Sequence, residues 1–137
     1  MTADAAFHDL CGYTLGLRDP AFIHQHAVDT YAAQTADGRT KPVKITFALV
    51  GLHLMLENNF TGRQVQRVHM ALAKRTRLWP SFPLPHDRGV MTVHDVLAAA
   101  PGPRRDAAIR AWCRSVWTAY GGCHSAVADL LRAHGFA

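Results

Sequence analysis

The stretch from residue 42 to residue 57 constrains the fold most, because apolar side chains cover nearly every face of the helix that its spacing predicts. A spacing of three or four residues relates Ile45, Leu49, Leu52 and Leu56, and the adjoining faces carry Phe47, Val50 and Leu54. A helix that is apolar all round must be surrounded by other elements or by lipid. The strongly apolar part covers only residues 45–56 and contains His53, whereas a membrane span needs roughly 20 apolar residues. We therefore expect a buried central helix and no membrane span.

Further segments with a helical period lie on both sides of this central stretch. We predict helices at residues 20–36, 62–76, 93–100, 104–120 and 123–135. N-cap signals precede the first three of them, at Asp19 before Pro20, at Thr61 and at Thr92. The pair Gly121 and Gly122 separates the last two, which form either one kinked helix or two helices at an angle.

The segment 78–89 contains three prolines and a glycine, which exclude a helix interior. We predict an extended loop there, with Trp79 and Phe82 held against the core. No segment shows the alternation of apolar and polar residues that is typical of a strand, and no internal repeat or linker divides the chain. The expected fold is an all-α, single-domain irregular bundle of five or six helices over residues 1–137.

Composition agrees with a packed globular domain. The chain has 137 residues, of which 49% are hydrophobic and 18% charged, so it is long enough to bury a core without disulfides. Its three cysteines are an odd number, and no basic-then-apolar leader precedes them. These features favour a reducing cytoplasm over a secreted disulfide framework.

The formal net charge is +5 and the isoelectric point is about 9.6, which raises the question of nucleic acid. The basic clusters are small: they are "KRTR" at residues 74–77, "PRR" at 103–105, and the pair Arg63 and Arg67. They lack the interleaved aromatic residues on which single-stranded bases stack. Specific nucleic-acid binding is therefore not expected, and the sequence leaves partners and a homo-oligomer open.

The sequence "HDLCG" at residues 8–12 has the spacing of a metal knuckle. Two ligands separated by two residues can turn back onto one ion, and the following glycine lets the backbone bend. His8 and Cys11 would form half of such a site. The other ligands would come from His24 or His26 near a helix start, or from Cys123 and His124. The alternative interpretation is that Cys11 is a small buried hydrophobe and His8 a terminal residue without a role.

The chain also resembles a known family. The order "CG", "HQHAVDTYAAQ", "MTVHDVLAA" and "RAWCRSVWTAYGGCHSAV" is similar to a bacterial family of uncharacterised small proteins, a domain of unknown function. Its members carry a Cys-x-x-Cys-Gly knuckle, a helix close to HxLxVDxYxxQ, and a C-terminal RxWxxSVWxAWxxHH. The resemblance places the knuckle on His8 and Cys11, the helix histidine on His24, and the terminal pair on Cys123 and His124. His8 replaces a cysteine and Cys123 a histidine, and each exchange keeps a zinc-ligand type.

The resemblance and the residue types together predict zinc bound by His8, Cys11, His24, His124 and Cys123, with the N-terminal knuckle docked near the start of the last helix. Four protein ligands make a closed structural site, whereas three ligands and a water leave it open for catalysis. We expect the structural form. The alternative is a metal-free helical interaction domain with weak nucleic-acid binding through its basic faces.

Two further pairs of residues were considered as sites. His53 and Glu57 lie one turn apart, as ligands do in di-iron bundles, but Glu57 is the only glutamate in the chain. We expect instead a hydrogen bond between them. His26 and Asp29 share a helix face, and without a nucleophile turn we interpret them as a solvated pair. Cys113 falls in the core register, so we interpret it as a packing residue.

The basic faces lead to a first prediction. A labelled DNA duplex should bind the protein weakly and without sequence preference, because only small clusters can neutralise phosphates. Fluorescence anisotropy should show this binding disappearing between about 50 mM and about 200 mM salt. Tight binding that persists at the higher salt concentration would contradict the prediction.

Overall fold

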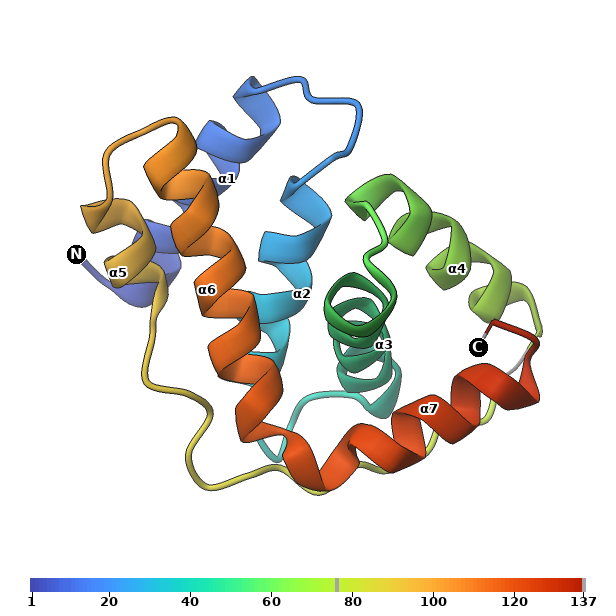
Figure 1. Cartoon of the computed structure of the whole chain (residues 1–137). Helices are drawn as coiled ribbons and strands as arrows, with labels where there is room; N and C mark the ends of the chain where they lie inside the picture. Colours follow the sequence, from blue (N-terminus) through green and yellow to red (C-terminus); the bar gives the residue numbers. More distant parts are fainter. Residues whose placement is uncertain (76, 137) are drawn as a thin grey trace.

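The structure is a computed structural model, and it describes residues 1–75 and 77–136. Over these residues it contains seven α-helices, one short 3-10 turn and no strand, so the predicted all-α fold is confirmed (Figure 1). The helices are α1 (Ala3–Gly16), α2 (His24–Thr35), α3 (Pro42–Asn58), α4 (Gly62–Arg75), α5 (Val93–Ala98), α6 (Pro103–Ala119) and α7 (His124–Ala133), with η1 (Gly121–Cys123) between the last two.

Helix α3 is the buried centre that its sequence predicts. It packs against α2, α4, α6 and α7, and Figure 1 shows it almost end-on among them. Its buried residues occur on all sides: Ile45, Thr46, Ala48, Leu49, Val50, Gly51, Leu52, Leu54 and Met55. Pro42 opens the helix, and Asn59 ends it in the left-handed region with φ 56°. No helix in the described part of the chain is long and apolar enough to cross a membrane.

The N-terminus differs from the prediction, because residues 3–16 form a helix where a knuckle was expected. Thr2 caps α1 by accepting a hydrogen bond from the Ala5 amide at 3.1 Å. Ala6, Leu10 and Thr14, spaced one turn apart, are its buried face. This face packs on α5 and α2, so the predicted docking of the N-terminus near residues 123–135 is wrong. Two features of the sequence indicate this helix: the N-cap residue Thr2 and the four-residue spacing of its buried side chains.

Helix α2 begins at residue 24, and the prediction of a start at residue 20 is wrong. The carboxylate of Asp19 accepts from the Ile23 amide at 3.1 Å, but Ile23 is the N-cap residue and no side chain caps the helix. Phe22 between them has φ 62°, a conformation that a helix does not contain. Residues 20–23 therefore form a turn, and the helix starts one turn later than Pro20 suggests.

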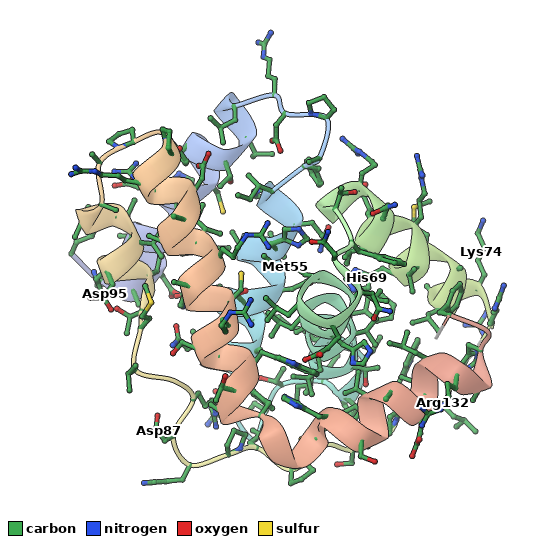
Figure 2. All side chains as sticks on the ribbon, in the orientation of Figure 1. Met55, His69, Lys74, Asp87, Asp95 and Arg132 are labelled. Carbon is green, nitrogen blue, oxygen red and sulfur yellow. The ribbon has the colours of Figure 1, made fainter. Side chains whose placement is uncertain are left out.

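Residues 78–89 form an extended loop before α5, as predicted. Phe82 is buried, and the Trp79 ring meets Phe47 of α3 edge-on at 5.2 Å. On α4, His69 points toward α3, where its Nε2 lies 2.8 Å from the Phe47 carbonyl oxygen (Figure 2). The loop ends against α6, where the Ser115 hydroxyl accepts from the Val90 amide at 3.1 Å.

Gly121 and Gly122 separate two helices instead of kinking one. They lie in η1, and α7 leaves it at a large angle to α6, along the lower edge of Figure 1. Tyr120, the last residue before the turn, is buried and donates its hydroxyl to the Ala33 carbonyl at 2.6 Å. This bond holds the corner against the end of α2, so that α7 can turn onto α3.

Gly51 is the point of closest approach between α2 and α3. A Cβ atom at this position would lie 1.9 Å from Asp29 Oδ2. By contrast, a Cβ at Gly12 of α1 would meet nothing within 4 Å. Only a glycine therefore lets the buried Asp29 side chain lie over the α3 backbone.

The two glycines lead to opposite predictions. Gly51→Ala should lower the free energy of unfolding by about 1–3 kcal/mol, because Asp29 or the helix must move. Gly12→Ala is the matched control in an open helical position, and it should stabilise the protein by about 0.5–1 kcal/mol. Urea unfolding followed by circular dichroism measures both. Equal stability of Gly51→Ala and the wild type would contradict the close packing of α2 on α3.

Candidate functional site

The junction of α1 and α2 carries two of the predicted zinc ligands, Cys11 on α1 and His24 at the start of α2. The two helices run antiparallel: the rings of Phe7 and Tyr31 stack at 4.1 Å, and the Thr14 hydroxyl lies 2.9 Å from His24 Nδ1. Cys11 lies between Phe7 and Thr14 on the same stripe of α1, one turn from each. We call this line of contact the α1–α2 seam. Cys11 and His24 are both half-buried in it.

The bond to Thr14 determines which nitrogen of His24 is free. The Thr14 hydroxyl has one proton, and its donor geometry is satisfied by the carbonyls of Leu10 and Cys11, both at 3.2 Å. When the hydroxyl donates to one of these carbonyls, it accepts from His24 Nδ1–H, and in that tautomer the Nε2 lone pair is free. Metal-binding histidines are held in this way by a hydrogen bond from the other nitrogen. Burial lowers the pKa of His24, so its ring is neutral near pH 7.

His8 lies one turn before Cys11 on α1 and is exposed. It is therefore on the solvent side of the seam, within the same helix as Cys11. Burial raises the pKa of the Cys11 thiol, which keeps it protonated until a base or a metal ion takes the proton. The seam thus carries the Cys11 thiol and the His24 imidazole, with the exposed His8 one turn away on α1, and it does not form the knuckle that the sequence predicted.

The other two predicted ligands lie at the opposite end of α2. Tyr120, just before them, bonds the carbonyl of Ala33. Ala33 lies more than two turns beyond His24, about 13 Å at 1.5 Å per residue. Cys123 is buried with its Sγ 3.5 Å from the Pro83 carbonyl. The structure therefore does not bring Cys123 and His124 to the seam.

His124 belongs instead to a second group of polar side chains around Trp117. Its ring stacks on the indole at 3.8 Å, and its Nε2 lies 2.7 Å from the Trp117 carbonyl oxygen. His53 meets the same indole edge-on at 5.8 Å. The predicted bond between His53 and Glu57 is wrong: Glu57 accepts from Trp117 Nε1 at 2.9 Å, and the buried His53 Nδ1 has no partner among the described residues. Two imidazoles and a carboxylate thus line one small cavity of about 310 Å³.

Neither group is preformed as a metal centre. In residues 1–75 and 77–136, no three or more His, Cys, Asp or Glu side chains are grouped so that they could hold a metal ion. Glu57 and His124 are already engaged with Trp117, whereas Cys11 Sγ and His24 Nε2 form no hydrogen bond with any described residue. Zinc binding stays a prediction. Within the described residues, the seam has the Cys11 thiol and His24 Nε2 without partners, and the cavity beside Trp117 has the buried Nδ1 of His53.

His26 and Asp29 are buried in α2, so their interpretation as a solvated pair is wrong. Asp29 Oδ1 accepts from Gln25 Nε2 at 3.1 Å. Among the described residues, Asp29 Oδ2 and His26 Nδ1 have no hydrogen-bond partner. Burial raises the pKa of Asp29 well above its usual value and lowers that of His26 to about 4. Burial therefore favours the neutral form of both side chains, and His26 is neutral near pH 7.

Cys113 packs beside these residues, and its prediction as a core residue is confirmed. It is fully buried, with its Sγ 3.0 Å from the Thr30 hydroxyl. Burial raises the pKa of the thiol to about 12. A thiol that stays protonated and closed to solvent is a poor nucleophile.

Three motif residues have roles that sequence reasoning missed. Gln34 accepts from Trp112 Nε1 at 2.9 Å and donates to the Met91 carbonyl at 2.6 Å, while Ser115 accepts from the amides of residues 90 and 91. Together they fasten the end of the long loop to α2 and α6. All three residues belong to the sequence motifs "VDTYAAQ" and "RAWCRSVW", which could have pointed to them. Their role in the structure is to hold the fold together.

Comparison with known proteins gives one match. The family of unknown function DUF5946 matches residues 4–121, which run from the second residue of α1 to the first residue of η1. The chain belongs to this family. No curated protein and no solved structure matches the chain. The bonds of Gln34, Trp112 and Ser115 lie within the DUF5946 region, whereas Cys123 and His124 follow it.

The buried Asp29 of this DUF5946 chain makes stability depend on pH in a defined direction. The folded protein keeps Asp29 protonated above the usual carboxyl pKa of 3.8, whereas the unfolded chain releases the proton. Ionisation therefore destabilises the fold as pH rises above 3.8, by up to about 1.4 kcal/mol per pH unit until the folded pKa is reached. Asn at this position cannot ionise and keeps an acceptor for Gln25.

We expect Asp29→Asn to gain stability relative to the wild type as pH rises. Urea unfolding of both chains at about pH 5 and about pH 8 measures this difference. His26, with its pKa lowered to about 4, stabilises the fold as pH rises toward its usual 6.5, but it does so equally in both chains. A stability difference that stays constant between the two pH values would contradict a buried neutral Asp29.

Proposed function

We propose that this protein binds a zinc ion at the solvent edge of the α1–α2 seam, through Cys11 and His24, with His8 as a third ligand. Thiolate and imidazole together are the donors that zinc favours among common metal ions. Three protein ligands leave one position for water, so the proposed site is open, in contrast to the closed four-ligand site that the sequence predicted. Cys123 and His124 are not part of it.

One observation carries the proposal, the bond between Thr14 and His24. This bond orients the ring and puts its lone pair on Nε2, the arrangement that a zinc-binding histidine requires. The low pKa of His24 means that no proton has to leave the imidazole at neutral pH. The proton on the Cys11 thiol does have to leave, so zinc affinity should rise with pH.

The state of the cysteines supports a reducing location. Cys11, Cys113 and Cys123 are all free thiols. A zinc-binding thiol must stay reduced, and cytoplasm keeps it so. We therefore propose a cytoplasmic protein. In that setting zinc would join α1 to α2 and so add to the contacts of Phe7 and Thr14 across the seam.

Zinc titration of the metal-free protein tests the proposal. Zinc at about 100 times its Kd should add about 2.7 kcal/mol to the free energy of unfolding and so raise Tm by several degrees. Cys11→Ala and His24→Ala should abolish both the rise in Tm and the bound zinc measured by elemental analysis.

Two variants serve as controls. His86→Ala removes an exposed loop histidine and should leave zinc content and the Tm shift unchanged. His124→Ala should also leave zinc content unchanged, because His124 lies at the other end of α2. A wild-type protein that takes up no zinc, or a Cys11→Ala chain that keeps it, would contradict the proposal. Loss of zinc in His124→Ala would point to the cavity beside Trp117 instead.

A further inference from the structure

The outer face of α6 forms one side of a long open groove. Residues 87–91 run beside this helix and form the other side, and the groove between them has a volume of about 880 Å³. Asp87, labelled in Figure 2, marks that segment next to the lower half of α6. From Ala107 to Ala119 the groove extends for about 18 Å at 1.5 Å per residue. It lies apart from the α1–α2 seam and uses none of the proposed zinc ligands.

The floor of the groove is shallow and mostly apolar. One row of side chains along α6 forms this floor, with a residue at every fourth position: Ala107, Ala111, Ser115 and Ala119. At the opposite wall the Val90 side chain is 87% exposed, while the amides of Val90 and Met91 each donate to the Ser115 hydroxyl and so fix this wall beside α6. A small-molecule site usually buries most of its ligand. An open groove of this length better fits a segment of another macromolecule.

Two arginines give the groove its charge. Arg110 and Arg114 lie one turn apart along its floor, and both are exposed. Within the described part of the chain the one ion pair joins Arg132 to Asp129, and neither groove arginine has a hydrogen bond. Asp87 is the one acid that lines the groove, and its Oδ1 accepts from the Gly89 amide at 3.1 Å. The two guanidinium groups are thus available to carboxylates of a partner.

The charges of Arg110 and Arg114 also argue against a second copy of this chain as the occupant of the groove. A symmetric dimer through α6 would bring Arg110 and Arg114 of both copies together, and like charges at close range are unfavourable. The C-terminal tail is also engaged elsewhere, because Phe136 lies under the guanidinium of Arg75 on α4. The occupant must therefore be a different chain that carries negative charge.

We propose that the α6 groove binds an acidic amphipathic helix of a partner protein. Its apolar ridge would lie on the row of small side chains and against Val90, and its Asp or Glu side chains would pair with Arg110 and Arg114. Helix-in-groove binding uses apolar residues at a spacing of three and four, which this row can accept. The net charge of +5 would also speed the approach of an acidic partner.

A synthetic peptide tests the proposal with the whole protein. The probe is a fluorescently labelled helical peptide with an Ala/Leu face flanked by Glu, and the comparison peptide has Gln in place of Glu. Fluorescence anisotropy should show tighter binding of the Glu peptide. Arg110→Glu with Arg114→Glu should weaken it at least about tenfold, since each reversal replaces an attraction by a repulsion. Ala111→Trp, which fills the exposed floor, should weaken both peptides.

The matched control reverses two exposed charges on another helix, Arg67→Glu with Lys74→Glu on α4, and keeps the same net charge as the groove variant. It should bind the Glu peptide within about twofold of the wild type. An equal loss of affinity for the Glu peptide in both double variants would show that net charge alone attracts the peptide, and it would overturn the proposal. So would equal binding of the Glu and Gln peptides, or a DNA duplex that binds the groove arginines more tightly than the Glu peptide does.

Discussion

Burial of α3 is the constraint on which the other helices depend. Its apolar side chains point in every direction, so no single layer of structure can remove them from water. Helices α2, α4, α6 and α7 each cover one side, and the long loop adds Trp79 and Phe82. The chain needs both the proline-rich loop and the Gly-Gly corner to return α6 and α7 to α3. These two irregular segments are therefore as important to the core as the helices that they connect.

Helix α2 has a different part in the same core, because it brings polar groups into it. Asp29 lies over Gly51, while Gln34 joins Trp112 to the backbone of the loop. A buried amide or carboxyl group without partners costs free energy, so each such bond selects one arrangement of α2, α6 and the loop. In this chain Gln34, Trp112 and Ser115 serve this purpose, and their bonds hold residues 90 and 91 beside α6.

The sequence predicted an element correctly where one strong pattern of residues extended over the whole element. It failed where a weak helical pattern competed with a motif that suggested another structure. The central helix and the extended loop were predictable, because all-round apolarity and three prolines allow few alternatives. Helix α1 was missed because Gly12 and the pair His8 and Cys11 suggested a knuckle. Its N-cap at Thr2 and its buried row of Ala6, Leu10 and Thr14 proved stronger. The polar pair on α2 was misjudged, since spacing alone does not tell which side of a helix faces the core.

The sequence by itself determined the fold class, the position of the central helix, the free cysteines and the types of side chain that could bind a metal ion. It did so because these properties follow from local period, composition and residue chemistry. Only the tertiary structure decided which of those side chains meet. The direction of α2 separates His24 from His124, and the contact of Thr14 with His24 leaves one imidazole nitrogen free. The α6 groove likewise arises from a loop and a helix that are distant in the chain, and distances of that kind depend on packing rather than on spacing along the sequence.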